Sequence, residues 1–166
     1  MRLSKRILSA TSMLLAAVLV GVFVAPASAQ AASVSATFAV TTFEFPPIAS
    51  IRGTLPLDLP VGDCRARGGS TTTLAYNRTT GIATVNWTQL ALTTSTIFGD
   101  VWHLTVRFRN PVRSVTVSVT LPDGDEMEDE NRLYLWDKDS APFQLSAATF
   151  ATISQPGSTV EWLSSC

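Results

Sequence analysis

Residues 101–121 read VWHLTVRFRNPVRSVTVSVTL, and this stretch decides the fold class. Apolar residues occupy every second position of each half: Trp102, Leu104, Val106 and Phe108 in the first, and Val115, Val117, Val119 and Leu121 in the second. A period of two predicts strands that bury one face and expose the other. Asn110-Pro111 supplies turn residues between the halves. The stretch therefore predicts an antiparallel hairpin with strands at 101–109 and 112–121.

The same alternation recurs along the chain beyond residue 30. Residues 33–40 alternate, and Asn77–Gly81 supplies turn residues between two further strands at 71–76 and 82–87. Other strands are expected at 89–97, 132–137, 143–153 and 159–163. About nine short strands predict an all-β fold, an antiparallel sandwich of jelly-roll or immunoglobulin-like type, with a flattened barrel as the alternative.

Residues 46–70 interrupt this pattern. They contain four prolines and four glycines: Pro46, Pro47, Pro56, Pro60, Gly53, Gly62, Gly68 and Gly69. Because proline cannot donate a hydrogen bond to a strand ladder, we expect mainly a long loop, or an edge segment, over 46–70.

The first 29 residues have the three parts of a secretory signal peptide. Basic residues at Arg2, Lys5 and Arg6 precede an apolar run over 13–25, and small residues at 27–29 form a cleavage site. The run is shorter than the roughly 20 residues of a membrane-spanning helix. We therefore expect export, by a bacterium to judge from the leader's composition, and a mature domain over 30–166 without a membrane span.

Charge argues against a nucleic-acid partner. The whole chain has a net charge of -1, from 12 basic and 13 acidic residues. Removing the three basic residues of the leader leaves nine basic residues against thirteen acidic ones, a net charge of -4. An acidic domain has no electrostatic footprint for an anionic polymer.

The chain has two cysteines, Cys64 and Cys166. In an exported protein they predict an intramolecular disulfide. An intermolecular bridge through Cys166, a reactive thiol and a pair of metal ligands are the alternatives.

An acidic run occupies residues 123–130. If it binds calcium, a hard cation that prefers oxygen ligands, the first candidate ligands are Asp123, Asp125, Glu128 and Asp129. The spacing does not match an EF-hand loop, so a solvated acidic turn is the alternative interpretation. No other cofactor is indicated.

Catalytic signatures are sparse. His103 is the single histidine, and the alternation places it on a solvent face beside Arg107 and Arg109. The chain has no G-x-S-x-G nucleophile elbow, and the exposed carboxylates lack the burial that raises a catalytic pKa. We expect a protein that is not an enzyme, with a small hydrolase that uses a carboxylate or a Ser/His site as the alternative.

Four tryptophans occur in the mature domain, of which Trp102 and Trp162 are expected in the core. On 132–137, Tyr134 and Trp136 face opposite to the flanking leucines. They are either covered by a loop such as 46–62 or exposed on an outer face. If exposed, Tyr134 and Trp136, flanked by Arg132 and Asp137, would form a platform for a sugar or a peptide.

These features favour a secreted or cell-envelope-associated binding module. Carbohydrate, including peptidoglycan, is the first expected ligand and a protein partner the second. A protease inhibitor that presents residues 46–63 as an exposed loop is a further alternative. The glycosylation sequons at Asn77 and Asn86 are interpreted as ordinary turn and strand residues.

Overall fold

This computed structural model describes residues 33–94 and 100–166. They contain eleven strands and one short helix, joined by turns and loops. The predicted signal peptide lies outside the described residues. The elements are β1 (Ser33–Phe45), β2 (Ile48–Thr54), β3 (Leu59–Val61), β4 (Cys64–Ala66), β5 (Thr71–Asn77), β6 (Ile82–Thr93), β7 (His103–Asn110), β8 (Val115–Thr120), β9 (Tyr134–Asp139), β10 (Phe143–Gln144), α1 (Ala147–Ile153) and β11 (Thr159–Ser165).

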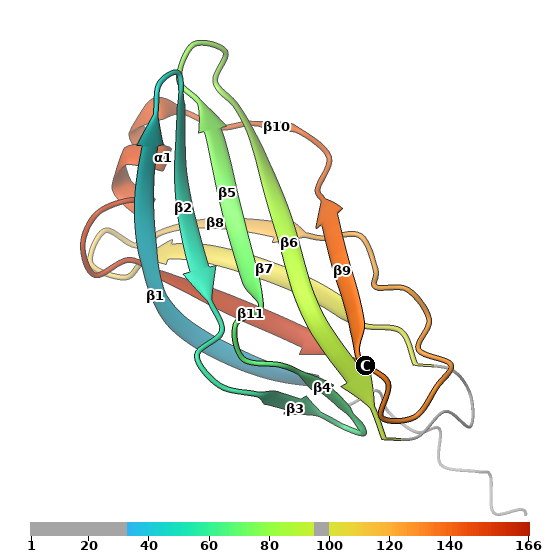
Figure 1. The fold of residues 1–166 in the computed structure, drawn as a ribbon. Helices are drawn as coiled ribbons and strands as arrows, with labels where there is room; N and C mark the ends of the chain where they lie inside the picture. The colour runs from blue at the N-terminus through green and yellow to red at the C-terminus, as the bar shows by residue number, and fades with distance from the viewer. Residues whose placement is uncertain (1–32, 95–99) are drawn as a thin grey trace, which may run out of the picture. The chain divides into compact units, whose positions relative to one another are not determined.

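All strand pairs are antiparallel and belong to one continuous sheet in the order β3-β4-β6-β5-β2-β1-β11-β7-β8, with β9 and β10 both paired to β6 (Figure 1). The 13-residue strand β1 joins the two halves of the sheet. Its first part pairs with β11, and its second part pairs with β2. The all-β, antiparallel prediction is therefore confirmed.

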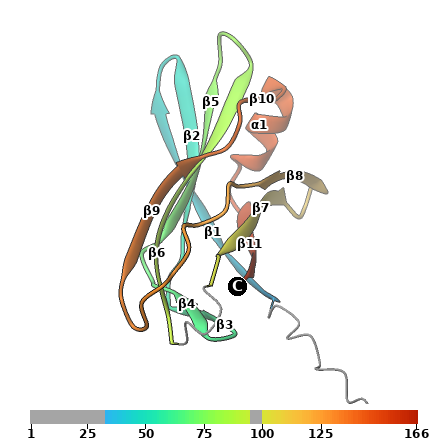
Figure 2. The ribbon, with the colours of Figure 1, turned by 90° about the vertical axis from the view of Figure 1, so that its right-hand side faces the viewer.

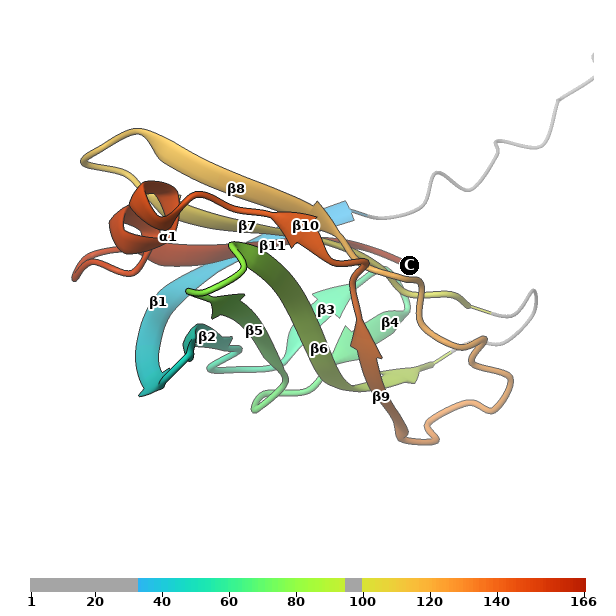
Figure 3. The same cartoon turned by 90° about the horizontal axis from the view of Figure 1, so that it is seen from above.

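The two halves of the sheet lie as layers over one another, with β7, β8 and β11 in one layer and β2, β5, β6 and β9 in the other (Figures 2 and 3). Trp162 of β11 donates its indole N–H to the Thr72 hydroxyl of β5 at 3.1 Å, which joins the layers across the core. Both Trp162 and Trp102 are fully buried, as expected. Phe38 contacts Trp162 edge to face, with ring centroids 5.6 Å apart.

Gly53 lets β2 approach this aromatic core closely. A Cβ atom at residue 53 would stand 2.7 Å from a ring carbon of Phe38 and 2.9 Å from Cβ of Val160. Such distances are shorter than any normal contact between carbon atoms, so the packing requires glycine at this position.

Both predicted hairpins are confirmed. β5 and β6 pair around the 78–81 turn, and β7 and β8 pair around the 111–114 turn. The strand expected separately at 89–97 is instead the continuation of β6 to Thr93, and its last residues fall outside the described residues. The strands expected at 132–137 and 159–163 are present as β9 and β11, shifted by two residues at most at each end.

The prediction of a mainly loop-like segment over 46–70 is wrong, because this segment contains β2, β3 and β4. Its prolines lie where a missing N–H costs little. Pro46-Pro47 forms the turn between β1 and β2, and Pro60 sits in the three-residue strand β3 at the end of the sheet. Buried side chains anchor the segment: Ala49, Ile51, Leu55, Leu59 and Val61. Residues 56–58, between β2 and β3, are exposed, so the stretch that could be presented as a loop is shorter than the 46–63 of the protease-inhibitor hypothesis.

The prediction of a strand over 143–153 is correct only for the first two residues, which form β10. The helix α1 occupies most of the remainder. The Ser146 hydroxyl accepts a hydrogen bond from the Thr149 amide at 3.0 Å, which caps the helix N-terminus. Phe150 stacks on Tyr76 of β5 at 4.7 Å between ring centroids, so α1 contributes to the core. None of the helices in the described part of the chain is long and apolar enough to cross a membrane.

Candidate functional site

Of the two alternatives for Tyr134 and Trp136, cover by another segment and an exposed aromatic platform, Trp136 shows the first. Trp136 is only 2% exposed and lies against Trp87 of β6, with ring centroids 5.7 Å apart. The segment after β8 covers it: a Cβ at Gly124 would stand 3.0 Å from the Trp136 ring. The other face of β9 carries Leu135, which is 65% exposed. The strand therefore buries its aromatic side and exposes its leucine side, and 121–130 provides the cover expected from 46–62.

The side chains of Tyr134 and Arg132 form hydrogen bonds with the acidic run. The Tyr134 hydroxyl accepts hydrogen bonds from the amides of Glu128 and Asp129, at 3.0 and 2.8 Å. Arg132 lies over the Tyr134 ring and donates to the Asp129 carboxylate at 2.6 Å. This hydrogen bond raises the pKa of the Arg132 guanidinium. Asp137 accepts hydrogen bonds from Asn86 at 2.7 Å and Thr88 at 3.4 Å on the outer face of β6.

The four candidate calcium ligands are not brought together. Asp123 bonds to His103 Nδ1 at 2.6 Å, Asp125 to Lys138 Nζ at 2.7 Å, and Asp129 to Arg132. Within residues 33–94 and 100–166, the acidic run contributes to no group of three or more potential ligand atoms at metal-binding distances. Asp125 and Asp129 therefore pair with cationic side chains of the chain itself, and Asp123 contacts the His103 ring.

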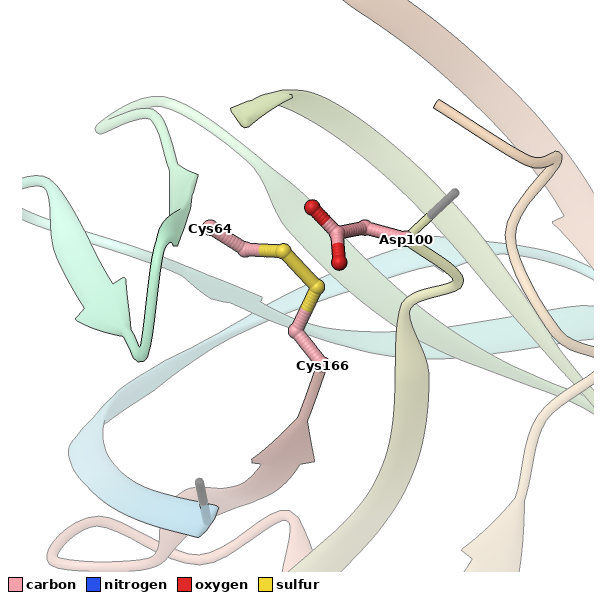
Figure 4. Close-up of side chains that lie close together, drawn as sticks. All are labelled: Cys64, Asp100 and Cys166. Atoms are coloured by element: carbon pink, nitrogen blue, oxygen red, sulfur yellow. A yellow bond between two sulfur atoms is a disulfide. The ribbon is translucent and has the colours of Figure 1, made fainter. Parts of the chain in front are cut away.

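A disulfide joins Cys64 of β4 to Cys166, 102 residues later, as predicted (Figure 4). The Asp100 carboxylate lies beside the two sulfur atoms and accepts a hydrogen bond from the Thr93 hydroxyl. Because the two sulfur atoms are bonded to each other, they are not available as thiolate ligands. This cluster therefore ties the residue after β11 to the opposite half of the sheet.

Among the described residues, the surroundings of His103 most resemble a catalytic arrangement. Its side chain is about half exposed and bonded to Asp123, and Ser165 lies directly opposite on β11. Among the described residues, no hydrogen bond joins His103 to a serine. An Asp–His pair with a serine on the adjacent strand has the residue types of a triad, but it lies on an open sheet face without a nucleophile–base contact.

Free strand edges are a second kind of candidate site, which the sequence reasoning did not consider. Apart from the two-residue β10, three strands pair on one side only within the described chain: β3, β8 and β9. A free edge presents unpaired N–H and C=O groups that can pair with another chain. Natural edge strands are protected by shortness, proline or charge.

Two of the three edges carry such protection. β3 is three residues long and contains Pro60, and β9 contains Asp137, Lys138 and Asp139. By contrast, β8 reads VTVSVT, with six residues, no charge and no proline. β8 is therefore the one edge of these three that lacks a barrier to pairing.

The ladder with β7 defines which backbone groups of β8 are free. The Leu121 amide donates to the Leu104 carbonyl at 2.9 Å, so the backbone N–H and C=O groups of the odd-numbered residues of β8 point toward β7. The N–H and C=O groups of Thr116, Ser118 and Thr120 consequently point away from β7 at the free edge. Among the described residues, β8 pairs with β7 alone, and no backbone hydrogen bond outside the strand ladders involves these three residues.

A groove of about 500 Å³ runs along this edge. β8 forms one wall, and residues 140–145 form the other. The inward side chains Val117, Val119, Phe143 and Leu145 give it an apolar floor, and no charged residue lines it. An unpaired backbone beside an apolar groove is the arrangement that binds an extended polypeptide strand.

Comparisons with protein-family models, with curated proteins and with solved structures return no match for this chain.

Proposed function

We propose that the chain is an exported β-sandwich module, not an enzyme, that binds a protein partner by adding an extended strand of that partner to β8. The observation that carries this proposal is the unprotected edge of β8. Main-chain hydrogen bonds to Thr116, Ser118 and Thr120 would supply affinity, and the groove beside Val117 and Val119 would select alternating apolar side chains. Carbohydrate becomes the less favoured ligand, because Trp136 is buried.

A direct test measures the binding of a fluorescent peptide with the sequence of residues 114–121, carrying terminal lysines for solubility, by fluorescence anisotropy. We expect saturable binding to the oxidised protein and a dissociation constant raised at least about tenfold by Ser118→Pro. The substituted proline removes a free-edge N–H without removing a bond to β7.

Leu135→Pro is the matched control. Ser140 donates to the Val85 carbonyl, so even-numbered residues of β9 face β6 and the Leu135 N–H also points to a free edge. Unchanged affinity in Leu135→Pro would show that proline at an edge is not itself the cause. Peptide binding that Ser118→Pro leaves unchanged would contradict the proposal.

A secreted hydrolase is a second candidate, supported by the His103–Asp123 contact and the position of Ser165. Turnover of ester or glycoside substrates that disappears in His103→Ala, while the melting temperature is unchanged, would favour it over a binding module. We expect no such turnover.

A further inference from the structure

We propose that the strand received by β8 is the β8 strand of a second copy of this chain, paired antiparallel about a two-fold axis at Ser118. This inference rests on the proposed function, because it names the partner of the same edge. The resulting two-fold dimer would continue the β11-β7-β8 half of the sheet from one copy into the next.

The backbone is self-complementary in this register. When Ser118 lies opposite its own equivalent, Thr116 lies opposite Thr120 of the second copy, and Thr120 lies opposite Thr116. All three free-edge residues then meet a free-edge residue, and each antiparallel pair can exchange two hydrogen bonds. The register therefore satisfies every N–H and C=O group that β8 leaves unpaired at its edge.

The side chains are also self-complementary. On the inner face, Val117 meets Val119 of the second copy, beside the groove that Phe143 and Leu145 help to line. On the outer face, hydroxyl side chains meet hydroxyl side chains. Pairs of β-branched residues and Thr–Thr pairs are favourable cross-strand neighbours. No charged side chain of β8 opposes this approach.

Charge at the ends of the strand favours the same antiparallel arrangement. Arg113 precedes β8, is exposed, and forms no ion pair among the described residues. The acidic run beginning at Asp123 follows β8. Continuing the register brings the Arg113 end of each copy toward the Asp123 end of the other. A parallel pairing would instead bring like charges together.

The test measures molar mass in solution by sedimentation equilibrium over a wide range of protein concentration. We expect a monomer–dimer equilibrium for the oxidised wild type, a dimer dissociation constant raised at least about tenfold in Ser118→Pro, and no change in Leu135→Pro. Ser118→Lys is a second edge variant that leaves the backbone donor in place, so it tests the edge even if the proline variant folds poorly. A wild type that stays monomeric at millimolar concentration would overturn the inference.

Cross-linking tests the register itself. Under air oxidation, Ser118→Cys should yield a covalent dimer, whereas Leu135→Cys at the edge of β9 should not. Equal dimer yields from the two variants would contradict pairing through β8. A monomer that still binds the 114–121 peptide would refute the second copy as partner and leave the proposed function standing. A protein that neither dimerises nor binds the peptide would refute both the second copy as partner and the addition of a strand at β8.

Discussion

Single residues decide how closely the two halves of the sheet approach, and Gly53 is the clearest case. We predict that Gly53→Ala lowers the free energy of unfolding by about 1–3 kcal/mol, because the added Cβ overlaps Phe38 and Val160. Urea denaturation measures the change. Ser50→Ala, on the outer face of the same strand, should change stability by no more than about 0.5 kcal/mol. Equal effects of the two substitutions would contradict this packing.

Trp136 shows the difference between a ligand platform and a core residue. Because its ring lies buried against Trp87, we predict that Trp136→Ala lowers the free energy of unfolding by about 3–5 kcal/mol. Leu135→Ala, on the exposed side of β9, should cost no more than about 0.5 kcal/mol. Thermal or urea unfolding measures the change. Wild-type stability in Trp136→Ala would contradict the burial of this ring and favour the exposed aromatic platform.

At the scale of elements, alternation predicts strands well where turn residues separate them. The β5–β6 and β7–β8 hairpins are of this kind, and both could be read from the sequence. β2 and β3 could not be predicted from the sequence. Proline indicates a break in a strand, but it does not show whether the proline lies at a turn or at the end of a sheet. The position of Pro60 at the sheet end depends on strand order, which contacts between distant residues determine.

The candidate site was missed for the same reason. The sequence shows that VTVSVT lacks charge, whereas 134–139 contains three charged residues. This difference becomes meaningful only when both segments are known to lie at free edges. The two alternatives for Tyr134 and Trp136 stayed open because alternation identifies two faces of a strand without identifying which of them is buried.

The helix α1 depends on its N-terminal cap. We predict that Ser146→Ala lowers stability by about 1 kcal/mol, because the Thr149 amide loses its acceptor, while Ser146→Asp retains most of the wild-type stability. Thermal unfolding monitored by circular dichroism compares the two variants. A smaller loss in the alanine variant than in the aspartate variant would contradict the cap.

At the scale of the whole molecule, the disulfide constrains almost the entire domain. The 102-residue separation of Cys64 and Cys166 corresponds to about 4–5 kcal/mol of loop entropy in the unfolded state, as an upper value. We therefore predict a clearly lower urea midpoint for the double variant Cys64→Ser, Cys166→Ser than for the wild type. An unchanged midpoint would show that the bridge adds no stability.

Whether β8 accepts another strand is tested most directly by amide hydrogen exchange, resolved residue by residue by NMR. In dilute monomer, the amides of Val117 and Val119 should be protected by β7, while those of Thr116, Ser118 and Thr120 exchange fast. Adding the 114–121 peptide, or raising the protein concentration, should slow exchange at Thr116, Ser118 and Thr120 selectively. Fast exchange at these three amides under both conditions would contradict strand addition at β8.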